Sequence, residues 1–191
     1  MVILGIDPGA RATGYGLLAA GAERPAFITA GVIRPPAAAP LAERLLAIDR
    51  ALRELVARHA PAAVAVESIF HAKSARSAIV LGHARGIALL AAASGGAPVA
   101  EYAPREVKMA VTGNGGAGKD QVRAMIARVL GTPERLGLDA TDAIAVALCH
   151  AYRMENDALF ARAGAAAGEP RAGDAGGPRS GGAGGPRRRG R

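Results

Sequence analysis

Short apolar runs separated by glycine and proline open this chain, and an abrupt change of hydrophobic period follows them. The runs cover residues 2–6, 13–20 and 27–33, and their lengths, with tight turn signals between them, predict three strands. From Leu41 apolar residues recur every three or four positions among charged ones, which predicts an amphipathic helix ending near His59. Two hairpin-like connections followed by a helical crossover restrict the chain to a mixed sheet.

The rest of the pattern predicts one further αβ repeat and then helices. We expect strands at 62–66 and 98–102, a small-residue helix at 74–93, and helices at 105–111, 120–130 and 139–157. Because crossovers between parallel strands are right-handed, the fourth strand lies parallel to the first. The prediction is an α/β fold with a five-stranded mixed sheet flanked by helices.

Length and composition predict one soluble domain with a basic tail. The 191 residues are half apolar, enough for one core. We expect a domain at 1–157 and a disordered tail at 158–191, because the tail consists largely of Gly, Ala, Pro and Arg. The net charge is +8, and much of it lies in this tail. A single cysteine, Cys149, and no recognisable signal or membrane segment favour a cytoplasmic protein without membrane attachment.

Four carboxylates lie at or beside the ends of apolar elements. Asp7 follows the first strand, Glu67 follows the fourth, and Asp139 and Asp142 lie three positions apart at the start of the last helix. An unpaired buried carboxylate is costly, so acids in such places need a cation or hydrogen-bond donors nearby. The carboxyl ends of parallel strands are also where open α/β sheets bind ligands. The alternative for the helical pair is that two acids simply favour the helix dipole.

An all-oxygen ligand set favours Mg²⁺ or Mn²⁺ over zinc, and Mg²⁺ commonly keeps waters and a substrate phosphate in its shell. Two such ions can activate a water and stabilise a leaving oxygen on opposite sides of one phosphorus. The four acids therefore predict hydrolysis of a phosphate ester.

Several segments resemble the RuvC family of crossover-junction endodeoxyribonucleases over about residues 1–155. They are GIDPGARATGYG, VESIFHAKSARSAIVLGHARG, YAPREVKMAVTGNGGAGKDQV and DATDAIAVALCHA, in the order and spacing of that family. The resemblance implies a ribonuclease H-like fold and resolution of Holliday junctions by paired symmetric nicks, in homologous recombination and DNA repair. By position it implies a catalytic, metal-binding set of Asp7, Glu67, Asp139 and Asp142, with two Mg²⁺ ions or Mn²⁺ in their place.

The same resemblance implies DNA contacts and partners. Phe70 matches a residue that inserts at the junction, where base stacking contributes about 1–3 kcal/mol. Lys108 and Lys119 match positions that contact the DNA backbone, whereas taken singly each would be an ordinary solvated charge. A four-way junction has near two-fold symmetry, so we expect a homodimer. The resemblance also implies cooperation with the RuvA and RuvB branch-migration complex.

Three other interpretations of these motifs can be compared by the residues or substrates that each requires. The segment 113–119, GNGGAGK, resembles a P-loop, but Asp120 replaces the metal-binding Ser or Thr and the segment ahead of it is predicted to be helical. A junction-binding module without cleavage would not need four acids beside a polyanion. A ribonuclease H-like enzyme acting on RNA hybrids stays open, and only a comparison of substrates would separate it.

Overall fold

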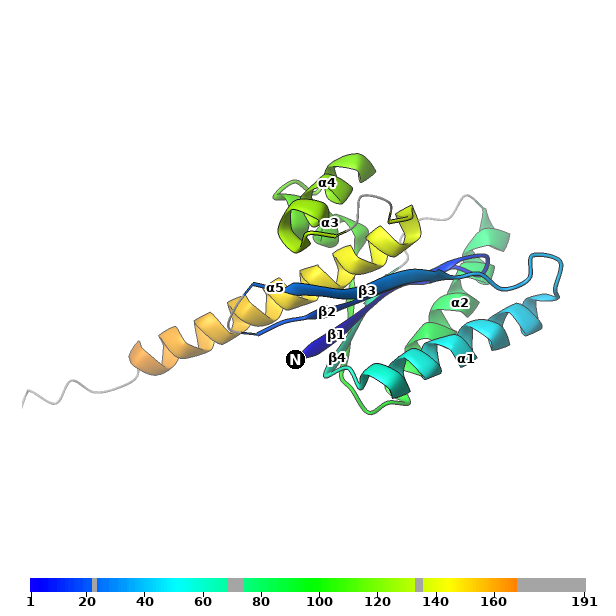
Figure 1. Ribbon diagram of the computed structural model, residues 1–191, viewed down its shortest axis with the longest axis horizontal. Coiled ribbons are helices and arrows are strands. Elements are labelled where there is room, and N and C mark those ends of the chain that lie inside the picture. The colour runs from blue at the N-terminus through cyan, green and yellow to red at the C-terminus, as the bar shows by residue number, and fades with distance from the viewer. Residues whose placement is uncertain (22–23, 69–73, 133–135, 168–191) are drawn as a thin grey trace, which may run out of the picture. The chain divides into compact units, whose positions relative to one another are not determined.

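Five strands form one mixed sheet in the computed structural model, which describes residues 1–167 apart from 22–23, 69–73 and 133–135 (Figure 1). The strand order is β3-β2-β1-β4-β5. The strands are β1 (Val2–Asp7), β2 (Thr13–Ala19), β3 (Ala26–Ile33), β4 (Ala63–Glu67) and β5 (Val99–Tyr102). β1 pairs antiparallel with β2, and β2 with β3, while β4 runs parallel to β1 and β5 parallel to β4. The predicted mixed sheet with a parallel fourth strand is confirmed.

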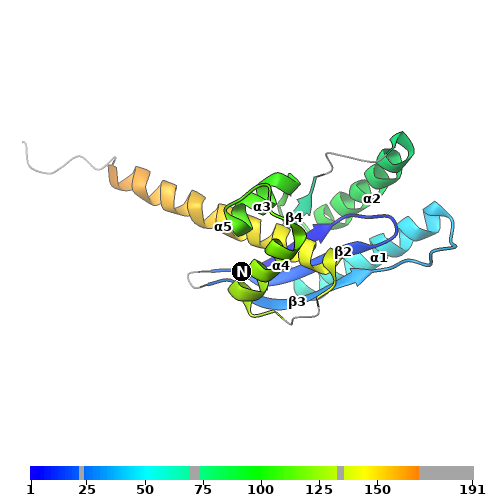
Figure 2. The same cartoon turned by 90° about the horizontal axis from the view of Figure 1, so that it is seen from above.

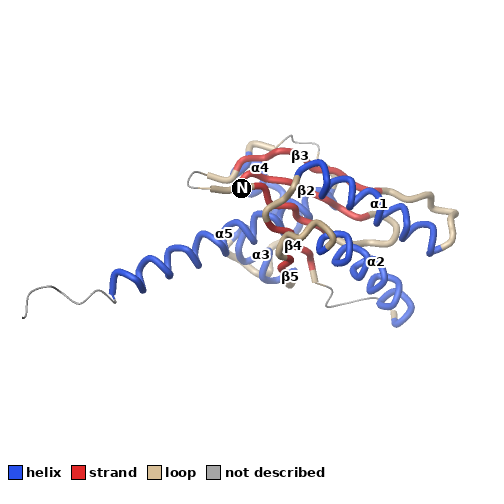
Figure 3. Tube along the Cα trace, turned by 90° about the horizontal axis from the view of Figure 1, so that it is seen from below, coloured by secondary structure: helices blue, strands red, loops and turns tan. Residues whose placement is uncertain are grey.

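In the described part of the chain, five helices cover the two faces of this sheet. They are α1 (Leu41–His59), α2 (Ala75–Ala93), α3 (Pro104–Thr112), α4 (Lys119–Leu130) and α5 (Leu138–Ala167). α1 and α2 pack on one face, and α3, α4 and the first part of α5 lie on the other (Figures 1 and 2). The tube view in Figure 3 also shows β5, the edge strand beside β4.

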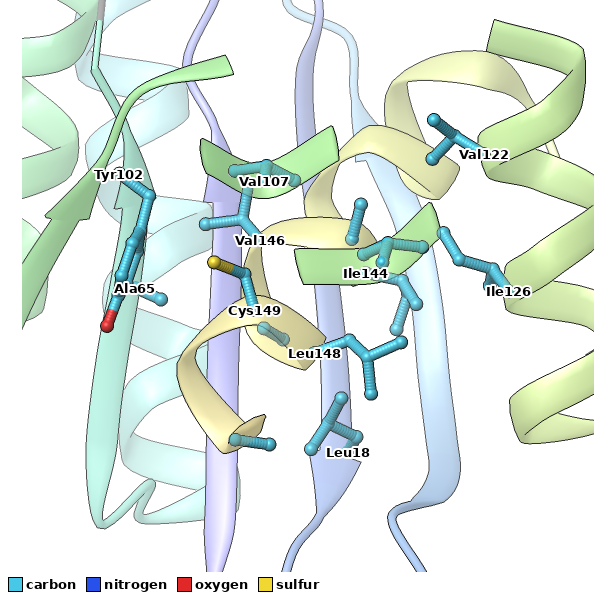
Figure 4. Packing of buried hydrophobic residues seen from close by; sticks show 14 of the residues in the cluster. Leu18, Ala65, Tyr102, Val107, Val122, Ile126, Ile144, Val146, Leu148 and Cys149 are labelled. Atoms are coloured by element: carbon cyan, nitrogen blue, oxygen red, sulfur yellow. The ribbon is translucent and has the colours of Figure 1, made fainter. Parts of the chain in front are cut away.

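Alternation along the central strands builds a core on each face. Side chains of successive strand residues point to opposite faces, so Leu4 and Ile6 pack towards α1 and α2 whereas Ile3 packs towards α5. The core on the α5 side includes Ile144 and Leu148, both fully buried (Figure 4). Burial on two faces fixes the register of β1 and β4, because a shift by one residue would exchange their faces.

Helix α5 is longer than the sequence predicted. We expected it to end at 157, and it continues to Ala167. The added segment is rich in alanine, the best helix former, and its first residues, 158–163, are exposed, so local propensity rather than burial accounts for the extension. Contacts group Met1–Asp157 as one unit and place the following residues in a second. Residues 168–191 of the expected tail lie outside the described part of the chain.

Candidate active site

Two of the predicted acids meet at one edge of the sheet because their strands are parallel neighbours. β1 ends at Asp7 and β4 ends at Glu67, and the residues just before them, Ile6 and Val66, are register partners. After burial, the charge of Glu67 is the largest cause that raises the pKa of Asp7, as expected for two close carboxyl groups. Because like charges this close repel each other, the pair favours a proton on one of the two groups.

Glycines in the sheet allow the first turns of α5 to lie directly on the strands. A Cβ atom on Gly14 would overlap the backbone oxygen of Asp139, and one on Gly5 would overlap the backbone oxygen of Ala143. Gly14 is also the register partner of Asp7 across the β1–β2 hairpin. The close approach therefore brings the start of α5, with its aspartates, over the end of β1.

The pKa of Asp7 depends on how close the other three acids lie to it. Burial, then the proximity and charge of Glu67, then the charges of Asp142 and Asp139 raise the pKa of Asp7 from 3.8 to about 8. Burial is also the main cause that raises the pKa of Glu67, with a further contribution from Asp142. The other three acids thus all act on Asp7, and a bound cation would favour its ionised form.

Two basic side chains lie at the aspartates of α5. Lys119, the first residue of α4, donates from Nζ to Oδ2 of Asp142 at 2.7 Å. Nη2 of Arg34, which follows β3, lies 3.7 Å from Oδ2 of Asp139. Among the described residues no three His, Cys, Asp or Glu side chains stand in an arrangement that could hold a metal ion. The acids are neighbours, but their side chains do not converge on one point.

The donor set still fits a hard divalent cation. It offers only carboxylate oxygens, the ligands that such ions prefer, and the charges of the neighbouring acids add to burial in raising the pKa of Asp7. The four side chains come from the ends of β1 and β4 and from the first turns of α5. A change of side-chain rotamer can therefore alter the distances between the carboxylates. The assignment of these four acids as metal ligands stays a prediction.

The remaining predicted residues divide in three ways. Lys108 on α3 acts on the site through its charge, which lowers the pKa of Glu67. Lys119 also lies at the site, but its ammonium group is paired with Asp142. Phe70 lies outside the described residues. The P-loop alternative is wrong, because the segment ahead of Gly113 is helix α3, whereas a P-loop follows a strand.

Sequence reasoning missed Arg34 and a cleft beside the acids. The cleft encloses about 1160 Å³ and runs from Asp7 and Glu67 along α3 and α5, with Tyr102, Met109 and Tyr152 among its lining residues. Arg34 could have been found from its place directly after the strand at 27–33, whose carboxyl end lies at the same sheet edge. The cleft is lined by residues far apart in the chain and has no local signal.

A mixed sheet of this order, with acids at the carboxyl ends of its two central parallel strands and at the start of a helix on one face, defines a ribonuclease H-like fold with a carboxylate site. The chain belongs to the RuvC family: the family model "Crossover junction endodeoxyribonuclease RuvC" matches residues 3–150.

Individual relatives agree with this family. The chain is 51% identical over 160 residues to the crossover junction endodeoxyribonuclease RuvC of Syntrophotalea carbinolica, covering 83% of this chain and 99% of the relative. Thermus thermophilus RuvC superposes with a TM-score of 0.71 at 35% identity, covering 86% of this chain and 97% of that one. The T. thermophilus protein in complex with Holliday junction substrate gives 0.74 at 32% identity, over 82% and 96% of the two chains.

Proposed function

We propose that this protein is a structure-selective endonuclease that resolves Holliday junctions by paired symmetric nicks, in homologous recombination and DNA repair. The observation that carries the proposal is the gathering of Asp7, Glu67, Asp139 and Asp142 at one sheet edge, in a chain that matches the RuvC family over residues 3–150. The junction as substrate is supported by the T. thermophilus relative, which was solved with it.

Asp7, Glu67, Asp139 and Asp142 would hold two Mg²⁺ ions, for which Mn²⁺ is a substitute. Such ions, when bound, supply activation of a water and charge stabilisation of the leaving oxygen. The charges of all three other acids raise the pKa of Asp7, so Asp7 is best placed to contribute to both ion positions. The strand ends hold Asp7 and Glu67 rigidly, while the cleft along α3 leaves room for a DNA strand beside them.

Lys108 and Lys119 would neutralise phosphates of that strand, each adding affinity that salt weakens. Phe70 would stack on a base at the junction, an assignment that rests on the sequence. We also propose a cytoplasmic location and cooperation with the RuvA and RuvB branch-migration complex, both on the family alone.

A homodimer would present two such sites to the two-fold symmetric junction. The support is the outward face of α2, where Ile79 and Leu90 are 61% and 56% exposed. Gly82 and Gly86 lie between them on the same face, since these positions are spaced at three and four residues. A Cβ atom on either glycine would meet nothing within 4 Å. These glycines therefore do not serve packing against the sheet, which leaves a close approach by a second copy as their role.

The test is a Mg²⁺-dependent cleavage assay on a four-way DNA junction, a linear duplex and an RNA:DNA hybrid, run with wild type and Asp7→Asn. We expect symmetric nicks confined to the junction. Asp7→Asn should abolish cleavage and keep or strengthen junction binding, because one negative charge facing phosphate is removed. Cleavage of the hybrid instead would reassign the substrate. Binding without cleavage in the wild type would make the protein a junction-binding module, and loss of binding in Asp7→Asn would remove Asp7 from the chemistry.

A further inference from the structure

Both aspartates of α5 are paired with a basic side chain from another element. Lys119 Nζ donates to Asp142 at 2.7 Å, and Arg34 Nη2 lies 3.7 Å from Asp139. In the absence of metal, each aspartate of α5 therefore has a cation of the chain itself as its partner.

The sheet register explains how Arg34 reaches this place. Asp7, Gly14 and Val32 form one row across β1, β2 and β3. Gly14 touches the backbone of Asp139, and Arg34 follows Val32 by two residues. Arg34 thus arrives at the same edge as the acids, from the side opposite to β4. Its side chain is 65% exposed, so it can leave Asp139 without disturbing the core.

Lys119 reaches the site from α4, which packs against α5 on the same face of the sheet. It begins α4, and the start of that helix is held by a hydrogen bond from the Gly118 N–H to Oε1 of Gln121 at 2.9 Å. Its ammonium group also interacts with the charges of Asp7 and Glu67. The side chain is 61% exposed, so this cation too can move away while its helix stays in place.

We propose that Arg34 and Lys119 are internal countercations, which occupy Asp139 and Asp142 in the metal-free enzyme and are displaced when a divalent ion binds. Arg34 is then a positioning residue, because it acts through Asp139. The inference rests on the proposed metal site. Displacement would free a guanidinium and an ammonium group beside the acids, where a substrate phosphate must lie, so that metal binding would prepare the site for the DNA backbone.

Competition follows from the chemistry of the carboxylate. An oxygen that accepts a charge-assisted hydrogen bond from Lys119 cannot give the same lone pair to a metal ion, and the basic side chain repels that ion as well. Exposed ion pairs are weak, so a divalent ion can displace them. Removing either cation should therefore tighten metal binding, although it takes positive charge away from a DNA-binding enzyme.

The experiment measures Mn²⁺ binding to the full chain by isothermal titration calorimetry without DNA. Arg34→Gln and Lys119→Gln should each lower the dissociation constant about twofold to fivefold, and the double variant should lower it further. Arg34→Lys and Lys119→Arg, which keep the charge, should remain near the wild type. Calorimetric melting in EDTA confirms that each variant is folded.

Lys108→Gln is the matched control. Lys108 acts on Glu67 through its charge, but within the part of the chain that the structure describes it forms no ion pair. Its removal should change the constant less than either test variant does. Equal effects for Lys108→Gln and Arg34→Gln, or no change in Arg34→Gln and Lys119→Gln, would overturn the inference and leave the metal site standing. Absence of Mn²⁺ binding in the wild type, with no difference from Asp7→Asn, would overturn the metal site itself and the inference with it.

Discussion

As a metal ligand Asp7 would have to be charged, yet its surroundings favour the protonated form. Burial and three neighbouring acids raise its pKa to about 8, against 3.8 for the ordinary side chain. Between these two pH values the unfolded chain has lost a proton that the folded protein keeps. The free energy of unfolding therefore falls as the pH rises from about 4 to 8. The contribution of Asp7 is fully present at low pH and is lost over that window.

Asp7→Asn should remove this dependence. In EDTA at pH 8 we expect the variant to be more stable than the wild type by about 1–3 kcal/mol, a value reduced for partial exposure and coupling of the group. Each kcal/mol corresponds to about 2–4 °C in melting temperature for a chain of this size. Scanning calorimetry from pH 4 to pH 8 measures the difference, which should shrink towards pH 4.

Asp120→Asn is the control for this prediction, because Asp120 is an aspartate of α4 whose side chain is 91% exposed. It should leave the pH dependence of the wild type unchanged. Saturating Mg²⁺ should reduce or reverse the advantage of Asp7→Asn, since the metal stabilises only the protein that binds it. A wild type more stable than Asp7→Asn in EDTA at pH 8 would contradict the prediction.

At the scale of elements, the position of α5 depends on glycines in the strands beneath it. Gly14→Ala would place a methyl group where the backbone oxygen of Asp139 lies, so the first turn of α5 must move away from β2. A shift of about 1 Å at a catalytic group can reduce a rate about 100-fold. We expect Gly14→Ala to lower junction cleavage by at least about tenfold and stability by about 1–3 kcal/mol, measured by single-turnover cleavage and calorimetry.

Gly21→Ala makes the same chemical change two residues beyond the end of β2, where a Cβ atom meets nothing within 4 Å among the described residues. It should keep the cleavage rate of the wild type. Wild-type cleavage by a folded Gly14→Ala protein would show that the close contact between β2 and α5 does not position the aspartates.

Most elements could be predicted from the sequence because each carries its own periodic signal. The strand at 2–6, the helix from Leu41 and the parallel strand that ends before Glu67 all lie within one or two residues of their predicted limits. The end of α5 was missed because no packing signal marks it, and an alanine-rich sequence continues the helix. Hydrophobic periodicity reports which face is buried, and this helix extends beyond its buried residues.

The adjacency of Asp7 and Glu67 was also predictable, because parallel strands share an edge. The pairing of Lys119 with Asp142 was not, since it joins the starts of two helices whose packing no local pattern specifies. The place of Arg34 at the same sheet edge could have been inferred from the strand that it follows, but its contact with Asp139 depends on the rotamer of a long side chain. The limits of a helix or strand depend on the local sequence, whereas the geometry of a site assembled from five elements depends on how those elements pack.

The outward face of α2 is an exposed apolar surface that the core of the described residues does not explain. The buried residues of this helix, which include Ala84, Ala88 and Ala91, lie on its opposite face. α2 is long and apolar enough to cross a membrane by length and composition, and only 22% of that stretch is buried within the protein. Contiguous exposed apolar surface in a folded protein commonly marks an interface, and a second copy of α2 is the occupant that the symmetric junction calls for.

Ile79→Glu should therefore convert a dimer into a monomer, because two glutamates would face each other across the two-fold axis without partners. Sedimentation velocity measures the mass, which should fall to about half that of the wild type.

Each protomer carries its own set of four acids, so the monomer should still nick a junction but lose the simultaneous second cut. A supercoiled cruciform plasmid shows this as nicked circles in place of linear product. Leu46→Glu, at a 47% exposed position of α1, is the matched control and should remain dimeric and cut both strands. A monomeric wild type, or a dimeric Ile79→Glu, would place the two-fold contact elsewhere or remove it.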